Sequence, residues 1–146
     1  MLKEEKAVNL LGDIIRFKAT GKDTQGKYSL LEITVPPQNG PPLHIHNRED
    51  ESYYVIDGQF SIQNGDDTIS ANTGTYIFIP KGRPNTYKNV GNNPGKLLIM
   101  YTPPGAEKAF EELGQPIDEE QQQASKPPDM NKLMETIKRY DMEIRA

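Results

Sequence analysis

Residues 40–58 read GPPLHIHNREDESYYVIDG and contain both histidines of the 146-residue chain, His44 and His46. In a strand, side chains two positions apart point to the same side and lie about 6.6 Å apart along the backbone. Glu51 follows the pair closely enough to return past it across a bend. Two neutral nitrogens and one carboxylate suit iron(II) or manganese(II) and leave open coordination positions. The stretch therefore predicts a metal site. The alternative is a pair of solvent-facing histidines beside a proline-rich turn, with Glu51 in a surface ion pair.

Glycine and proline interrupt the chain at short intervals between residues 21 and 105. The segments between them are too short for most helices and are rich in Ile, Val, Tyr, Phe and Thr, which favour strands. Asp57-Gly58 and Asn64-Gly65 predict hairpin turns, because glycine adopts a positive φ at little cost. The pattern predicts an all-β sandwich or barrel, with strands over residues 13–19, 28–35, 52–57, 59–63, 68–71, 76–80, 86–89 and 96–102.

The hydrophobic period changes after residue 105, where two segments place apolar side chains on one helical face. The faces are formed by Ala106, Ala109, Phe110 and Leu113 in residues 106–113, and by Met130, Leu133, Met134, Ile137, Tyr140 and Ile144 in residues 129–145. Asp129 is placed to cap the second helix, and residues 117–128 form a polar linker. We therefore expect a β domain with an N-terminal segment, residues 1–105, and a helical extension, residues 106–146. The extension packs on the β domain or on a second subunit.

The charge pattern narrows the range of partners and locations. The 17 Lys and Arg residues are outnumbered by 21 Asp and Glu, for a net charge of −4, and they are spread along the chain. Nucleic acid and anionic membranes need a concentrated basic patch, so neither is expected as a partner. The chain has no Cys, which excludes disulfides and thiol chemistry. No apolar stretch approaches the roughly 20 residues that span a bilayer, and the first residues are charged, which predicts a cytoplasmic protein.

Two spaced motifs resemble those of the cupin superfamily. Gly40, His44-x-His46, Glu51 and Gly58 resemble its first motif, and Gly74, Pro80-x-Gly82, Asn85 and Asn89 resemble its second. The resemblance covers about residues 28–102 and implies an all-β, double-stranded β-helix (jelly-roll) barrel that holds a metal at its mouth, followed here by the pair of C-terminal helices. His44, His46 and Glu51 would then be metal ligands. Small cupins commonly pair through their sheets, so the resemblance also implies a homodimer.

The chain departs from the cupin pattern at two places. Gly40 stands three residues before His44, where the family usually has five, a loop difference of little consequence. Asn85 occupies the position of the fourth ligand, a histidine in the family, and no other histidine can replace it. The amide oxygen of Asn is a weaker donor to transition metals than imidazole. Asn85 therefore ligates weakly, leaves a three-ligand site, or hydrogen-bonds a ligand in a pocket that has lost its metal.

Two tyrosines are candidates for the substrate pocket. Tyr53 lies on the same side of its strand as Glu51, and Tyr87 lies on the same side as Asn85. The alternative for both is an ordinary place in the apolar core. The acidic residues directly before Glu51, Glu49 and Asp50, are expected to face solvent.

The resemblance implies an enzyme, and the helical tail is similar to that of single-domain cupins of the quercetinase-like dioxygenase type. Its substrate would be a small oxygen-rich molecule of the flavonol, enol or diketone type, bound at a divalent transition metal such as Fe, Mn, Ni or Zn. Glu51 would act as a catalytic base if the metal holds it loosely. A metal-dependent isomerase would need the same parts. The third hypothesis is a binding or sensing module without catalysis, in which the metal site is weakened or absent because of Asn85.

Overall fold

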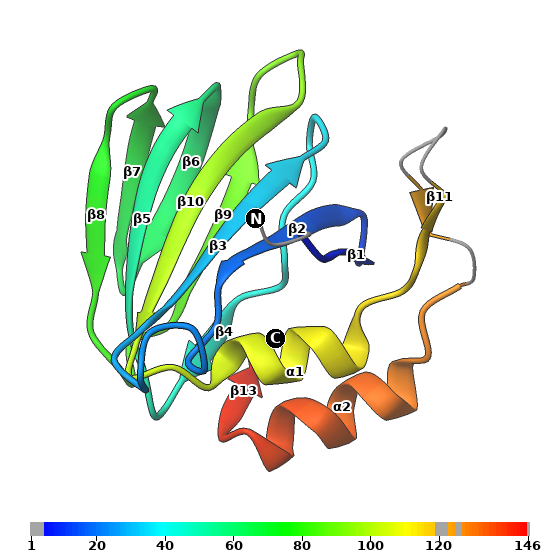
Figure 1. Cartoon of the computed structure of the whole chain (residues 1–146). Helices are drawn as coiled ribbons and strands as arrows, with labels where there is room; N and C mark the ends of the chain where they lie inside the picture. The colour runs from blue at the N-terminus through cyan, green and yellow to red at the C-terminus, as the bar shows by residue number, and fades with distance from the viewer. Residues whose placement is uncertain (1–4, 119–122, 125–126, 146) are drawn as a thin grey trace.

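The computed structural model describes residues 5–118, 123–124 and 127–145, and within them two antiparallel sheets face each other (Figure 1). The first sheet has six strands in the order β1-β2-β3-β10-β5-β8. Their bounds are Ala7–Leu10 (β1), Asp13–Ala19 (β2), Ser29–Val35 (β3), Gly95–Thr102 (β10), Asp50–Asp57 (β5) and Tyr76–Ile79 (β8). The apolar side chains that alternate along these strands point into the space between the sheets.

The second sheet has five strands in the order β13-β4-β9-β6-β7. Their bounds are Met142–Ile144 (β13), His44–His46 (β4), Asn85–Asn89 (β9), Gln59–Asn64 (β6) and Asp67–Asn72 (β7). A small additional pair joins Ile117–Asp118 (β11) to Gln123–Ala124 (β12) inside the expected linker. The described strands form a double-stranded β-helix of two separate sheets rather than a closed barrel, so the all-β prediction is confirmed.

The two predicted turns have different outcomes. The predicted hairpin between β6 and β7 is confirmed, but its two-residue loop is Gly65-Asp66, one residue later than predicted, because Asn64 pairs with Asp67. The prediction of a hairpin at Asp57-Gly58 is wrong, because β5 and β6 belong to different sheets. Gly58 has φ 109° there and turns the chain from one sheet to the other. The glycine signal identified a sharp change of direction, but local sequence does not show whether the next strand pairs or crosses.

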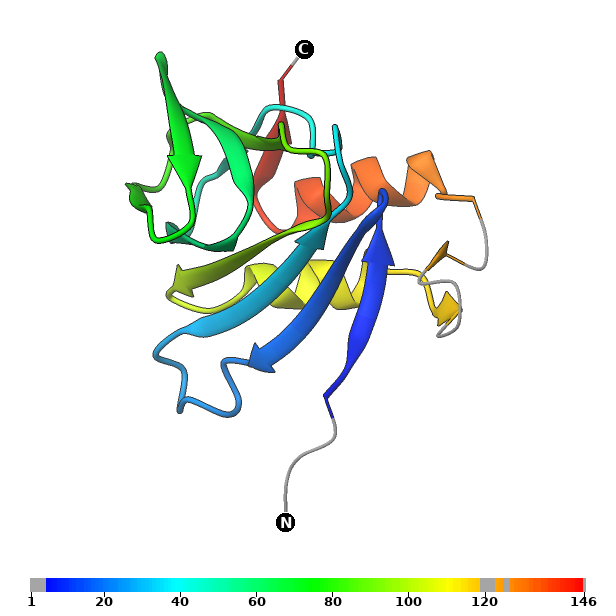
Figure 2. The ribbon, with the colours of Figure 1, turned by 90° about the horizontal axis from the view of Figure 1, so that it is seen from above.

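The first helix, α1, covers Ala106–Leu113 as predicted, and its side chains Ala106, Ala109 and Leu113 are buried. The second helix, α2, covers Met130–Arg139, and Asp129 caps it by accepting a hydrogen bond from the Lys132 backbone N–H at 3.0 Å. Both helices lie side by side at one end of the sheets (Figures 1 and 2). No described helix has the length and apolarity needed to cross a membrane.

The prediction that the second helix runs to residue 145 is wrong. The helix ends at Arg139, Asp141 adopts φ 56°, and the chain continues as strand β13. Met142 and Ile144 are two positions apart, a spacing that fits one face of a strand. The free edge of β4 provides backbone hydrogen-bond partners for this segment. Two other members of the predicted apolar face, Met130 and Met134, are exposed in the structure.

Candidate metal centre

The three predicted metal ligands come together between the two sheets. His44 and His46 lie on β4 of the five-stranded sheet, and Glu51 lies on β5 of the six-stranded sheet. One ligand atom from each lies within 4.8 Å of the others. The imidazole rings meet edge to face, with centroids 5.0 Å apart. The i, i+2 spacing thus places both rings on the inner side of β4, as the sequence predicted.

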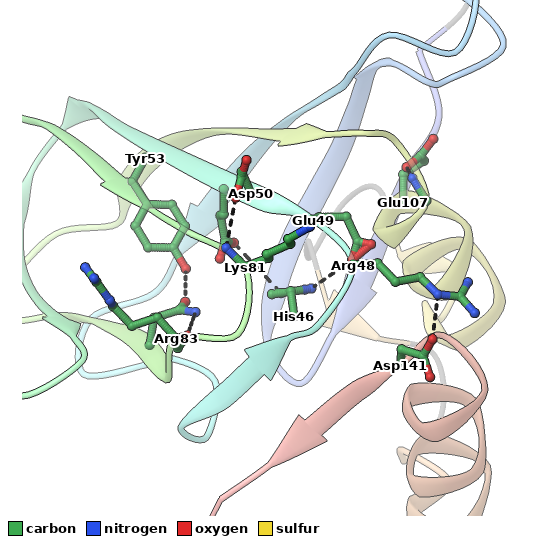
Figure 3. Close-up of polar contacts among 12 residues, drawn as sticks. His46, Arg48, Glu49, Asp50, Tyr53, Lys81, Arg83, Glu107 and Asp141 are labelled. Atoms are coloured by element: carbon green, nitrogen blue, oxygen red, sulfur yellow. Dashed lines mark hydrogen bonds and ion pairs between the residues drawn. The ribbon is translucent and has the colours of Figure 1, made fainter.

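Each histidine has an oxygen facing its Nδ1 atom. His44 Nδ1 lies 3.0 Å from the carbonyl oxygen of Pro42, which leaves Nε2 with a free lone pair. His46 Nδ1 lies 3.7 Å from Glu49 Oε1 (Figure 3). Its Nε2 lies 3.9 Å from Glu51 Oε2. Outer partners of this kind orient metal-binding imidazoles and select their tautomer. The arrangement therefore presents the Nε2 atom of each ring as a ligand.

The burial of Glu49 contradicts the prediction that it faces solvent. Glu49 is 3% exposed, whereas the next residue, Asp50, is half-buried and accepts a hydrogen bond from the Lys81 backbone N–H at 2.9 Å. Strand β5 starts at Asp50, so Glu49 precedes the strand and does not follow its alternation. Its side chain turns towards His46 instead (Figure 3). Strand parity could not predict this orientation, because a loop residue has no fixed face.

Several buried polar atoms of the centre have no hydrogen-bond partner in the described part of the chain. They include both ring nitrogens of His46 and both carboxylate oxygens of Glu51. Buried polar groups are rarely left unpaired, because the loss of hydration costs about 1–3 kcal/mol for each group. A divalent cation bound by Glu51 and by the Nε2 atoms of His44 and His46 would satisfy most of them. The two nitrogens and one carboxylate fit iron(II), manganese(II) or a similar ion.

The electrostatics of the centre favour a cation between the ligands. Burial lowers the pKa of His44, and the charge on His46 lowers it further, so His44 is a neutral ligand at physiological pH. Burial also raises the pKa of Glu51. At His46 burial opposes protonation, but the carboxylates of Glu51 and Glu49 outweigh it and raise the pKa. Two carboxylates thus face a single imidazole, an arrangement that a metal ion stabilises better than a proton does.

Asn85 occupies the expected place opposite His44 in the β4–β9 ladder. Its side-chain amide, however, is hydrogen-bonded to other residues of the protein. The amide oxygen accepts a hydrogen bond from the Tyr53 hydroxyl at 2.7 Å, and the amide nitrogen donates to the Arg83 carbonyl at 3.2 Å. Of the three alternatives for Asn85, this geometry favours a three-ligand site in which Asn85 positions Tyr53.

A cavity of about 100 Å³ extends from the centre. The candidate pocket residues Tyr53 and Tyr87 both line this cavity, and both also belong to the buried core. The pocket interpretation and the core interpretation are therefore both correct for these tyrosines. Three further polar residues line the cavity wall without having been predicted, Asp13, Tyr101 and Glu143. Tyr101 pairs with Glu51 across the β5–β10 ladder. Only the long-range strand pairing brings it there, and no local sequence signal marks it.

The C-terminal extension closes the cavity within the same chain. Leu113, Leu133 and Ile137 of the two helices line it, and the Phe110 ring lies 6.5 Å from that of His46. Strand β13 pairs with the histidine strand, so that Met142 is opposite His46. The helices and β13 therefore form the apolar roof of the centre.

Comparison with known proteins agrees with this architecture. The family model described as "Cupin domain" matches residues 31–101, which contain all three candidate ligands. The structure resembles an RmlC-like cupin from Shewanella frigidimarina, with a TM-score of 0.63 and 13% identity, over 72% of this chain and 89% of that one. This chain belongs to the cupin superfamily. The KdgF structure from Halomonas sp. matches this cupin similarly, with a TM-score of 0.62 and 13% identity, over 73% of this chain and 91% of that one.

Two curated relatives are also similar to this cupin in sequence. An uncharacterized protein of Methanocaldococcus jannaschii is 33% identical over 53% of this chain and 62% of its own length. The quercetin 2,3-dioxygenase of Bacillus subtilis is 24% identical over 75% of this chain and 32% of its own length. The cupin chain thus covers less than two thirds of either relative.

Proposed function

We propose that this protein is a small metal-dependent cupin enzyme of the dioxygenase type. The observation that carries the proposal is the set of buried, unpaired atoms on His46 and Glu51, which face a cavity together with His44. Natural proteins keep such unpaired buried groups mainly at functional sites. The distant similarity to a quercetin 2,3-dioxygenase supports the type of reaction.

The residues of the centre have distinct roles in this proposal. His44, His46 and Glu51 would hold the metal, which supplies Lewis acidity and open positions for substrate and oxygen. Glu49 and the Pro42 carbonyl orient the two imidazoles from behind. The roof formed by Phe110 and the other apolar side chains would limit the access of water to the metal. Glu51 would also accept a proton from the substrate if the metal holds it loosely.

The size of the cavity limits the substrate. A cavity of about 150 Å³ holds benzene, so a cavity of about 100 Å³ takes a molecule of at most similar size. A flavonol has three rings and would require the roof to open. Among the predicted substrate types, the cavity therefore favours a small enol or diketone.

The second candidate function is a binding module without catalysis, and Asn85 is the observation that favours it. The missing fourth ligand weakens any metal site, and the amide of Asn85 is already engaged by Tyr53 and Arg83. In this case the cavity would bind a small molecule and the centre would hold no metal in the cell.

Elemental analysis of the purified protein separates the two candidates. We expect near-stoichiometric iron, manganese, nickel or zinc in the wild type after incubation with each ion, and a loss of at least tenfold in His44→Ala and His46→Ala. Tyr76→Phe, on the exposed outer side of β8, is the control. Oxygen uptake with acetylacetone then tests the reaction. A wild type that takes up none of these ions would refute the enzyme and support the binding module.

The homodimer and the cytoplasmic location remain predictions. An exposed aromatic group on the outer side of β5 and β8, formed by Tyr54, Tyr76 and Phe78, supports self-association. Light scattering checks this prediction, and a monomeric mass would contradict it.

A further inference from the structure

Asp13 lies in the cavity wall at the start of β2, on a different strand from the three candidate ligands. It is 6% exposed, and its two carboxylate oxygens accept hydrogen bonds from the Asn39 amide at 2.7 Å and the Tyr87 hydroxyl at 2.6 Å. Burial raises the pKa of Asp13 to about 6, although the hydrogen bonds from Tyr87 and Asn39 act in the opposite direction. Asp13 is thus ionised at neutral pH. The proposed metal chemistry does not use it.

The protons of the cavity wall are mostly committed to other protein groups. Tyr87 donates to Asp13, Tyr53 donates to Asn85, and His44 Nδ1 faces the Pro42 carbonyl. The wall in the described part of the chain includes no Lys, Arg, Asn, Gln, Ser or Thr. Apart from Tyr101 and His46 at the metal centre, the polar positions that remain open to a ligand are therefore chiefly the lone pairs of acceptors.

The charges in the wall also favour a ligand that donates a hydrogen bond. Asp13, Glu51 and Glu143 all line the cavity, and no Lys or Arg of the described wall balances them. Carboxylate or phosphate groups would be repelled at the Asp13 end, whereas a neutral O–H group would find an acceptor there. A tyrosine oxygen that donates its proton to a carboxylate is polarised and becomes a stronger acceptor. Tyr87 is in this situation.

We propose that the Tyr87 oxygen, held by Asp13, is the binding site for a hydroxyl group of a small neutral ligand in the cavity. The inference rests on the proposed function, since the other end of the ligand would lie at His44, His46 and Glu51. It narrows the substrate class to neutral enols and α-hydroxy ketones with a compact apolar body, and it excludes small carboxylates and phosphate esters.

Two probes with the same carbon skeleton test this site. Acetoin carries a hydroxyl group where butane-2,3-dione carries a carbonyl. Isothermal titration of the metal-free wild type should show a Kd for acetoin about tenfold lower, as expected for one hydrogen bond to a polarised acceptor. Tyr87→Phe should bring the two Kd values together, and the control Tyr76→Phe should preserve the difference. Equal Kd values in the wild type, or an unchanged preference in Tyr87→Phe, would overturn the proposal.

Asp13→Asn provides a second, independent readout. The new amide can donate to the Tyr87 oxygen, so the Tyr87 proton can turn into the cavity. The site then becomes a donor, which the carbonyl group shared by both probes can satisfy, so the preference for acetoin should disappear. A wild-type preference that survives in Asp13→Asn would contradict the proposal, and so would acetate that binds metal-free wild type more tightly than acetoin. These titrations need no metal, so a failure of metal uptake would refute the enzyme without affecting this test.

Discussion

Glu49 Oε1 faces His46 Nδ1 at 3.7 Å, and both side chains are 3% exposed. Neither of these atoms has a hydrogen-bond partner in the described structure. A ring with a metal on Nε2 must carry its proton on Nδ1, where Glu49 is the available acceptor. Glu49 therefore acts as a positioning residue for His46 and adds a second negative charge beside the centre.

Glu49→Gln should weaken metal binding by about 10- to 100-fold, because the amide keeps the shape of the side chain but loses its charge. Competition with a chelating dye measures the affinity. Asp66→Asn, in the exposed β6–β7 loop, removes the same charge from a side chain that does not line the cavity and is the matched control. An affinity of Glu49→Gln within twofold of the control would show that Glu49 does not support His46.

Asn85→Ala should destabilise the fold by about 1–3 kcal/mol, because the buried Tyr53 hydroxyl loses its acceptor. Denaturant unfolding measures the change. Tyr53→Phe removes the donor of the same pair, so the effect of Asn85→Ala should be smaller in a Tyr53→Phe background. Metal content should change less than twofold. A loss of metal as large as that of His44→Ala would instead identify Asn85 as a ligand.

The stability of the protein should depend on the ionisation of Asp13. Its pKa is raised from 3.8 to about 6 in the folded state, so the folded protein binds this proton more tightly than the unfolded chain. The stabilisation is fully present below pH 3.8 and is lost as the pH rises through 6, at a cost of up to about 3 kcal/mol.

Asp13→Asn removes this titration. The difference in unfolding free energy between the wild type and Asp13→Asn should shift in favour of the variant between pH 4 and pH 6, and stay constant above pH 7. Urea unfolding at several pH values checks the slope, with Asp66→Asn as the control. A difference that does not vary with pH would show that Asp13 has no raised pKa in the folded state.

Removal of residues 141–146 should weaken metal binding, because strand β13 pairs with the histidine strand and lines the cavity. We expect a loss of affinity of about tenfold or more, as when a residue that hydrogen-bonds a metal ligand is removed. Asp141→Asn removes only the exposed ion pair with Arg48, worth about 0–1 kcal/mol, and should keep the affinity. Dye competition and thermal unfolding measure both variants. Wild-type affinity in the truncated protein would show that β4 holds its histidines without β13.

Most strands of the β domain were predictable because their signals are local. Asp13–Ala19 and the helix Ala106–Leu113 start and end where the hydrophobic pattern indicates. The convergence of His44, His46 and Glu51 was also predictable, since spacing and family motif both place them together. Strand β1 and strand β13 were not predicted, because short segments of weak pattern become strands only when a partner edge satisfies their backbone.

The sequence by itself determined the jelly-roll fold, the histidine pair on one side of a strand, and the replacement of the expected fourth ligand by Asn85. Only the tertiary structure decided how Asn85 is used, because its partner Tyr53 is 32 residues away in the chain. The burial of Glu49 and the pairing of Asp13 with Tyr87 likewise depend on contacts between distant segments. Local periodicity fixes the face of a side chain within its strand, whereas hydrogen-bond partners and charge environment follow from which strands the fold brings together.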